Sequence, residues 1–110
     1  DWIYVEDTCE AIFRVFKYGK IKTTYNVGGE QQIENLEIAK KICDYINISH
    51  KHFNYDCTKL LRFVDDRQGH DIRYNLDISK IKKELKWKPK HTLDQGLKKT
   101  IEWYKTLLKK

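Results

Sequence analysis

The sequence predicts an α/β protein in which short strands alternate with about four helices. Short runs rich in β-branched and aromatic residues are each followed by a stretch whose apolar residues recur at helical spacing. Strands separated by helices are typical of a sheet with some parallel pairing. The chain has 110 residues, of which 40% are hydrophobic, and a single proline. This composition fits one folded domain over residues 1–110 and excludes a disordered chain.

The first two predicted elements are a strand at 1–5 and the helix that follows it. The strand is the alternating run "DWIYV". We predict that Asp7 caps the helix, because Glu10 stands three residues later as in a capping box, and that Gly19 ends it. One apolar stripe runs along this helix and consists of Cys9, Ile12, Phe13 and Phe16.

The middle of the chain predicts two further strands around a second helix. The run "TTYNVGG" at 23–29 reads as a strand closed by its two glycines. Asn35 stands where an N-cap would precede the helical stretch "LEIAKKICDYI". The apolar run "LLRFV" at 60–64 is expected to be a strand that leads into a charged loop at 64–77, which has neither helical nor strand periodicity.

Two helices are predicted after this loop. Asp77 is expected to cap "ISKIKKEL", and Thr92 with Gln95 forms a capping box at the start of the last helix. Residues 80–110 hold eleven lysines and only three acidic residues, a composition that nucleic-acid surfaces share. The apolar residues of the last helix keep helical spacing, so we interpret most lysines as its solvated face and do not expect a nucleic-acid partner.

The charged loop contains the groups of an anion clamp. Arg67 offers a fixed fork of donors, Gly69 allows close approach of the backbone, and His70 adds a further donor. Asn35, at a helix start, could offer its amide to the same anion. The alternative is a solvated turn in which Arg67 and Arg73 pair with the nearby acids, namely Asp65, Asp66 and Asp71.

Other reactive residue types do not form a site in the sequence. His50 and His52 make an H-x-H without a second ligand cluster, so we expect no metal site. Cys57 has no recognisable base nearby in the sequence and is not expected to be a nucleophile. Three widely spaced cysteines indicate neither a disulfide framework nor a zinc knuckle, and favour a reducing, cytoplasmic compartment. No apolar run is long enough to span a membrane.

The start of the chain predicts a piece of a longer protein. The sequence contains no methionine, and its first residue already lies within an apolar alternation. We therefore expect that essential chemistry precedes Asp1. The aromatic residues are interpreted as core and as surface packed against that missing part, namely Trp2, Tyr4, Trp87, Trp103 and Tyr104.

Several stretches occur in the order and spacing of one enzyme family. They are "DWIYVED", "TYNVGG", "NLEIAKKIC", "DDRQGHDIRYNLDISKIKKELKW" and "TLDQGLKKTIEWY". In these the chain resembles the C-terminal third of dTDP-glucose 4,6-dehydratases, which are extended short-chain dehydrogenases with a Rossmann-type fold. The resemblance covers nearly the whole chain apart from residues 47–59, and the charged loop is its most specific part.

The resemblance implies a substrate site in the charged loop. It implies that Asp66, Arg67, Gln68, Gly69 and His70 lie along a nucleotide-diphosphate sugar, with the arginine on phosphate. Asn35 is implied to belong to the same site. Gln68 replaces the usual proline of the family, which leaves the preferred nucleotide open.

The resemblance also implies that NAD and the catalytic groups lie outside this chain. The family oxidises the sugar with NAD, eliminates water and returns the hydride, using a Y-x-x-x-K pair in an N-terminal Rossmann portion. Tyr18 with Lys22 and Tyr55 with Lys59 match that spacing, but about one match is expected by chance and neither lies where the family's pair does. The glycine spacing of an NAD phosphate loop is also missing.

We therefore expect the isolated chain to be inactive and the complete enzyme to form a homodimer. Two alternatives stay open: a UDP-sugar 4,6-dehydratase or epimerase of the same family, and a basic binding module without enzymatic activity.

Overall fold

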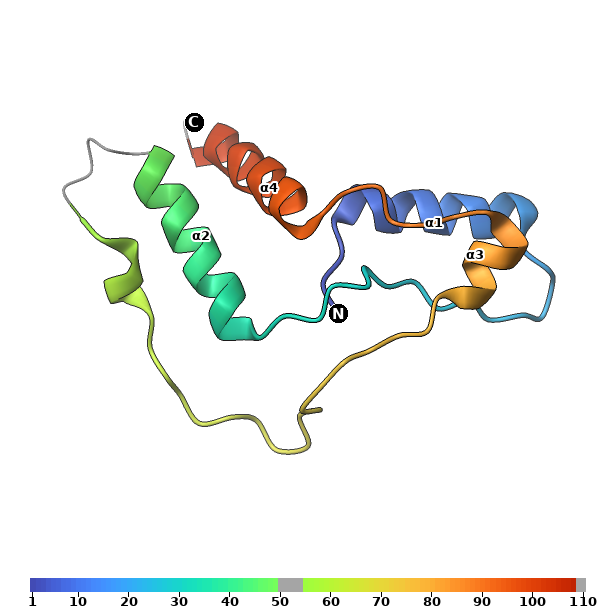
Figure 1. Cartoon of the computed structure of the whole chain (residues 1–110), viewed down its shortest axis with the longest axis horizontal. Helices are drawn as coiled ribbons and strands as arrows, with labels where there is room; N and C mark the ends of the chain where they lie inside the picture. Colours follow the sequence, from blue (N-terminus) through green and yellow to red (C-terminus); the bar gives the residue numbers. More distant parts are fainter. Residues whose placement is uncertain (50–54, 109–110) are drawn as a thin grey trace. The chain divides into compact units, whose positions relative to one another are not determined.

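The computed structural model describes residues 1–49 and 55–108, and its regular structure is helical (Figure 1). The helices are α1 (Val5–Tyr18), α2 (Asn35–Ser49), α3 (Ser79–Leu85) and α4 (Leu93–Leu108). A short 3-10 helix, η1, spans Cys57–Leu60. The prediction of about four helices is confirmed.

The chain divides into two compact units, each built from two separate segments. The first unit consists of residues 1–32 and 73–96, and therefore contains α1, α3 and the first residues of α4. The second unit consists of residues 33–72 and 97–110, and contains α2, η1, residues 64–72 of the charged loop and the rest of α4. All six predicted site residues belong to the second unit.

The predicted strands are wrong for the residues that the structure describes, where no β-strand is present. A strand needs a ladder of backbone hydrogen bonds to a neighbour. The run at 1–5 makes one such contact, from the N–H of Trp2 to the carbonyl of Gln31 at 3.1 Å, and Val5 already belongs to α1. Residues 23–29 form no ladder, and residues 61–64 also lie outside any strand, with residues 62–64 exposed. The three runs have strand-like sequences but no partner strand within the described chain.

The helix ends follow the predicted capping chemistry in three cases and depart from it in two. Gly19 ends α1, and its N–H donates to the carbonyl of Val15 at 2.8 Å. The side chain of Asp77 accepts the N–H of Ser79 at 2.8 Å at the start of α3. The capping box of α4 is also confirmed, because Thr92 and Gln95 each accept the other's backbone N–H, at 2.9 and 3.3 Å.

The two departures are small shifts of a helix start. α1 begins at Val5, so Asp7 lies inside its first turn, where it is buried instead of capping the helix. α2 begins at Asn35 itself, one residue before the predicted start, and its first bond runs from the N–H of Ile38 to the carbonyl of Glu34 at 3.1 Å. Asn35 is therefore the first helical residue of α2.

The core of the first unit lies between α1, α3 and the chain that follows α3. Its buried members are Ala11, Ile78, Ile81, Leu85 and Trp87, each 6% exposed or less. Partly buried residues of the extended segments pack against them, namely Ile3, Tyr25 and Val27. The guanidinium of Arg14 on α1 also donates to the carbonyl of Leu85 at 2.9 Å, which satisfies a carbonyl at the end of α3. The predicted core role of Trp87 is confirmed.

A close approach of two extended segments fixes the start of the chain in the first unit. The carboxylate of Asp1 accepts backbone N–H groups of Gly29 at 2.9 Å, Gln31 at 3.4 Å and Leu76 at 3.3 Å. Position 29 requires glycine, because a Cβ there would overlap the carbonyl oxygen of Trp2. One carboxylate thus joins three stretches of chain that are distant in sequence.

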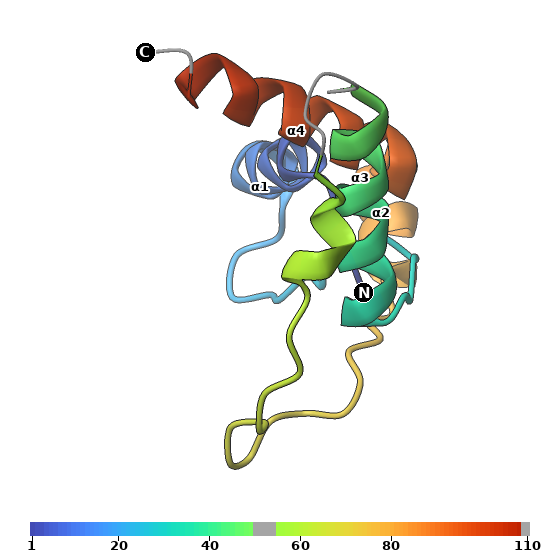
Figure 2. The same ribbon diagram turned by 90° about the vertical axis from the view of Figure 1, so that its left-hand side faces the viewer.

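In the second unit, η1 lies beside α2 (Figure 2). The side chain of Asn47 on α2 joins the two, because its oxygen accepts the N–H of Cys57 at 3.0 Å and its amide donates to Asp56 at 3.0 Å. Asp56 also accepts the N–H of Thr58 at 3.0 Å and so caps η1. Ile38 and Cys43 are the buried residues of α2. These contacts anchor the start of the connection that carries the charged loop.

Candidate functional site

The charged loop contains a tight turn at residues 67–70. The N–H of His70 donates to the carbonyl of Arg67 at 3.3 Å, and Gly69 adopts a φ of 71°. This combination is typical of a type II turn, which needs a positive φ at its third residue and favours proline at its second. Gln68 occupies that second position. The positive φ explains why glycine occupies the third position of the turn, since an L-residue is strained at this φ.

Asp66 braces the turn from the outside. Its Oδ1 accepts the N–H of Arg67 at 2.8 Å and lies 2.7 Å from Nδ1 of His70. The hydrogen bond with His70 lowers the pKa of the Asp66 carboxyl below 3.8, and the Arg67 N–H and the charge of His70 act in the same direction against the effect of desolvation. A lowered pKa means that this contact stabilises the turn at neutral pH and is lost as the pH falls below 3.8.

The guanidinium of Arg67 is left available by this arrangement. Within residues 1–49 and 55–108 it forms no ion pair or hydrogen bond, although Asp65, Asp66 and Asp71 are close in sequence. Arg62 differs, because its guanidinium donates to the carbonyls of Lys59 at 2.7 Å and Leu61 at 3.0 Å.

Arg73 also differs, because its guanidinium donates to the side-chain oxygen of Gln32. Both residues belong to the first unit. The alternative in which both arginines pair with neighbouring aspartates is therefore not the arrangement found in the described chain.

Asn35 and the loop are not joined by a hydrogen bond among the described residues. Asn35 is exposed at the first position of α2, with Glu37 in the same turn. Gln68 and Gly69 are also exposed, and a Cβ on Gly69 would meet nothing within 4 Å. The structure therefore brings Asp66, Arg67 and His70 together, whereas it does not bring Asn35 to them.

An open hollow of about 470 Å³ precedes the turn and is lined by Phe63, Val64 and Asp65. Phe63 is 87% exposed and Val64 is 85% exposed. The sequence suggested a strand at 60–64, so Phe63 and Val64 were not among the predicted site residues. The one available signal was position, because Phe63 directly precedes the charged loop and Val64 and Asp65 are its first residues.

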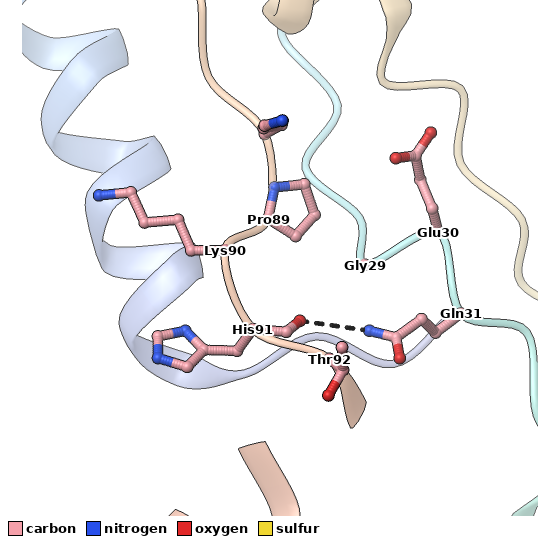
Figure 3. Close-up of a pocket in the computed structure, with 8 residues that line it drawn as sticks. Gly29, Glu30, Gln31, Pro89, Lys90, His91 and Thr92 are labelled. Carbon is pink, nitrogen blue, oxygen red and sulfur yellow. Dashed lines mark hydrogen bonds between the residues drawn. The ribbon is translucent and has the colours of Figure 1, made fainter. Parts of the chain in front are cut away.

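A second hollow, of about 360 Å³, lies in the first unit (Figure 3). Residues 29–31 line one side and residues 88–92 line the other, and the amide of Gln31 donates to the carbonyl of His91 at 3.5 Å. Two of the charges around it are paired: Lys90 with Glu10 at 2.7 Å, and Glu30 with Lys82 at 2.6 Å. Lys88 also lines the hollow and forms no ion pair among the described residues.

A buried acid that the sequence did not reveal lies next to this hollow. Asp7 is 2% exposed, and its two carboxylate oxygens accept the backbone N–H and contact Nδ1 of His91, each at 3.0 Å. The ring of Tyr4 meets the His91 ring edge-on at 4.8 Å between centroids. Burial alone would raise the pKa of Asp7, but the hydrogen bonds from His91 and Lys90 outweigh it, so the pKa lies below 3.8.

The other candidate catalytic and metal-binding residues of the sequence are not brought together in a site within the described residues. Tyr18 is the last residue of α1 and has the Lys17 ammonium 5.2 Å from its ring centroid. Cys57 is half-buried in η1 and is a free thiol. The H-x-H of residues 50 and 52 lies outside the described residues. Within the described residues no group of three metal-binding side chains is present, and no helix there is long and apolar enough to cross a membrane.

Comparison with known proteins identifies the family. The family model for GDP-mannose 4,6 dehydratase matches residues 1–100 of this chain. The chain belongs to this family. It is 43% identical over 108 residues to a dTDP-glucose 4,6-dehydratase of Haemophilus influenzae, an alignment that covers 94% of this chain and 32% of the relative. It is 42% identical over 105 residues to dTDP-glucose 4,6-dehydratase 1 of Escherichia coli K12, covering 94% of this chain and 28% of that protein.

A solved structure of this family has the same fold over nearly the whole chain. It is the dTDP-glucose 4,6-dehydratase of Bacillus anthracis in complex with NAD, with a TM-score of 0.80 and 34% identity, covering 96% of this chain and 31% of that one. The resemblance predicted from the sequence is thereby confirmed, and so is the likeness to a Rossmann-type dehydratase. The chain spans about a third of the length of the relatives it matches, between 28% and 32%.

Proposed function

We propose that this chain is the part of an NAD-dependent dTDP-glucose 4,6-dehydratase that binds the nucleotide-diphosphate sugar. The family and the relatives named dTDP-glucose 4,6-dehydratase support the reaction and the substrate. The Bacillus anthracis relative was solved with NAD, which supports NAD as the cofactor. We assign NAD binding and catalysis to a Rossmann portion outside this chain, so the 110 residues alone carry no turnover.

The observation that carries the proposal is the guanidinium of Arg67, which has no hydrogen-bond or ion-pair partner among the described residues. The turn around it is stabilised by other contacts. Asp66 holds the turn through the Arg67 N–H and His70, and leaves the arginine fork to an external anion. A guanidinium binds phosphate through two parallel hydrogen bonds, which suits a diphosphate. Gly69 allows the substrate to approach the backbone, since a Cβ built at this position would meet no atom of another residue within 4 Å.

The remaining predicted site residues take supporting roles in this proposal. Asp66 and His70 position the turn, and Gln68 sets its stiffness. Asn35 lies at the positive end of the α2 dipole, where an anion would be stabilised, and reaches the substrate once it is bound. The complete enzyme is proposed to be a homodimer. A reducing, cytoplasmic compartment belongs to the same proposal, because all three cysteines are free thiols.

Binding of dTDP to arginine variants tests the proposal. We would replace the matching segment of the Haemophilus influenzae relative with residues 1–110 and titrate dTDP into this chimeric enzyme by calorimetry. A charge-assisted hydrogen bond contributes about 1.5 to 3 kcal/mol, so Arg67→Ala should weaken dTDP binding by roughly 10- to 150-fold. Arg67→Lys should recover only part of this loss, because an ammonium lacks the two-pronged geometry.

Arg62 provides the matched control in the same connection. Its guanidinium is occupied by carbonyls of its own segment, so Arg62→Ala should leave the dTDP affinity unchanged. Equal dissociation constants for wild type and Arg67→Ala would refute the diphosphate role. Titration of UDP in parallel separates the UDP-sugar alternative, which predicts that UDP binds at least as tightly as dTDP.

A further inference from the structure

Two cysteines of the second unit lie on elements that pack against each other. Cys43 is in the middle of α2, and Cys57 is the first residue of η1, which lies beside α2 (Figure 2). The two positions are 14 residues apart in the chain, so no local pattern in the sequence indicated a pair. Both are free thiols in the structure, and the proposed phosphate site uses neither of them.

A hydrogen bond places the backbone of Cys57 over the face of α2 that carries Cys43. Asn47 follows Cys43 by four residues, so their side chains lie one turn apart on the same face. The Oδ1 of Asn47 accepts the N–H of Cys57 at 3.0 Å. Because helical side chains lean toward the N-terminus of their helix, the Asn47 side chain extends back toward Cys43. A disulfide joins Cα atoms roughly 4.4 to 6.8 Å apart, which is about one helical turn. This arrangement brings the two cysteines to about that separation.

The two thiols are also close enough to interact electrostatically. Burial raises the pKa of the Cys43 thiol above its ordinary value, and a charge on Cys57 acts in the same direction, as do Asp44 and Asp56. The interaction between two charges falls with their separation, so this effect agrees with the position that the Asn47 hydrogen bond gives to Cys57.

The two thiols differ in their access to solvent. Cys43 is 8% exposed, whereas Cys57 is half-buried. An oxidant in solution therefore meets Cys57 first, and Cys43 is the second partner. A partly exposed cysteine beside another cysteine is typical of thiol redox sites. Cys9 differs, because it is exposed on α1 in the first unit, which contains no other cysteine.

We infer that Cys43 and Cys57 form a redox modification site, in which a hydroperoxide oxidises the two thiols to a disulfide that fastens η1 to α2. The Cys57 thiolate attacks one peroxide oxygen. An S–O bond forms, the O–O bond breaks, and the other oxygen leaves with the Cys57 proton as water or an alcohol. Cys43 then attacks the sulfur of the Cys57 sulfenic acid. An S–S bond forms, the S–O bond breaks, and the hydroxyl leaves with the Cys43 proton as water. Two electrons pass from the two thiols to the peroxide, and a small thiol reductant restores both thiols by exchange.

The disulfide fixes the start of the connection that carries the charged loop. In the dithiol form, the side chain of Asn47 holds η1 to α2 through its hydrogen bonds to Asp56 and Cys57. A 3-10 helix of four residues opens at low cost, and a covalent bond at its first residue removes the open states. A reducing compartment keeps the pair as thiols until peroxide is present, as is usual for redox-sensing cysteines in the cytosol. The inference does not require that Arg67 bind phosphate.

Peptide mapping of the chimeric enzyme tests the site. The enzyme is treated with hydrogen peroxide, its remaining thiols are blocked with N-ethylmaleimide, and it is digested with trypsin without reduction. The lysines at 41, 51 and 59 place the two cysteines in separate peptides, residues 42–51 and 52–59. We expect mass spectrometry to find these two peptides joined, at least roughly tenfold more often than any disulfide of Cys9. Dithiothreitol should return both peptides to their free form.

Single variants separate the roles of the two thiols. Cys43→Ala removes the second partner, so the Cys57 sulfenic acid should accumulate and bind dimedone at least roughly tenfold more than in wild type. Cys57→Ala should leave the buried Cys43 unlabelled, and it keeps the test informative if Cys43→Ala unfolds, which circular dichroism checks. Cys9→Ala is the matched control, and the yield of the joined peptides should stay within about twofold of wild type.

Hydrogen exchange reports on the fastening of η1. The backbone amides of Lys59 and Leu61 donate hydrogen bonds at this helix, each at 3.1 Å, and should exchange at least roughly fivefold more slowly in the oxidised enzyme than in the reduced one. Three results would overturn the inference: no joined peptides after peroxide, a main product that contains Cys9, or equal exchange in the two forms. Equal dTDP affinity of wild type and Arg67→Ala would refute the proposed function but leave these readouts unchanged, so the two fail separately.

Discussion

Replacing Asp7 with alanine should destabilise the first unit strongly, although Asp7 is not among the predicted site residues. Its carboxylate is 2% exposed and accepts two hydrogen bonds from His91, each at 3.0 Å. Breaking a buried charged pair costs about 3 to 5 kcal/mol, because the remaining partner is left desolvated. The His91 side chain is 20% exposed, so water can replace part of the lost contact. We therefore expect Asp7→Ala to lower the free energy of unfolding by about 2 to 4 kcal/mol.

The control for this prediction comes from the same helix. Glu10 also joins α1 to the segment before α4, through Lys90 at 2.7 Å, but the lysine is 62% exposed. An exposed pair contributes at most about 1 kcal/mol, so Glu10→Ala should have a small effect. Urea denaturation followed by circular dichroism and tryptophan fluorescence measures both variants. If Asp7→Ala costs no more than Glu10→Ala, the buried contact does not stabilise the unit as we argue.

The pH dependence of this contact gives a further check with a defined sign. The pKa of Asp7 is lowered in the folded chain, so its contribution to stability is present above the unfolded pKa and is lost as the pH falls through the folded value. The difference in stability between wild type and Asp7→Asn should therefore be constant near neutral pH and shrink below pH 3.8. A difference that does not decrease below pH 3.8 would show that the ionised Asp7 carboxylate is not the source of the stabilisation.

Three smaller changes test the local chemistry of the turn and of α4. Thr92→Ala removes half of the capping box and should cost about 1 kcal/mol, read out as a lower helix content and an earlier urea midpoint, whereas Thr92→Ser should be nearly neutral. Gln68→Pro restores the residue that a type II turn favours; it should raise dTDP affinity by roughly two- to fivefold in the chimeric enzyme and slow exchange of the His70 amide. Gly69→Ala places a Cβ at a φ of 71°. It should lower dTDP affinity by roughly 5- to 30-fold through backbone strain, and unchanged affinity would exclude the turn from the site.

The sequence predicted the elements whose causes are local. Gly19, Asp77 and the Thr92–Gln95 pair act within a few residues of the helix they begin or end, so their chemistry is readable from spacing. The strands failed for the opposite reason. The run at 23–29 has the alternation of a strand, but strand formation depends on a neighbour that the described chain does not supply.

The candidate site likewise contains contacts between residues close in sequence and contacts between residues far apart in sequence. The charged loop was recognised from its composition and from the family resemblance. The structure adds the Gly69 turn and its stabilisation by Asp66 and His70, which involve residues at most four apart. The pairing of Asp7 with His91 joins residues 84 positions apart, and no local pattern indicates it. Asp7 was instead predicted to be a helix cap, because Glu10 follows three residues later as in a capping box.

The division of the first unit into residues 1–32 and 73–96 has a consequence for how the chain is made. Ala11 on α1 is synthesised about 70 residues before Ile81, which covers it in the folded unit. At translation rates of about 5 to 20 residues per second, Ile81 is synthesised roughly 4 to 14 s after Ala11. For that time the inner face of α1 lacks the α3 residues that bury it. During this interval that face is exposed to the ribosome surface and to chaperones. Slowing of translation between residues 33 and 72 would lengthen the interval between synthesis of α1 and of α3. It should therefore lower the yield of folded protein more than the same delay placed after Gly96.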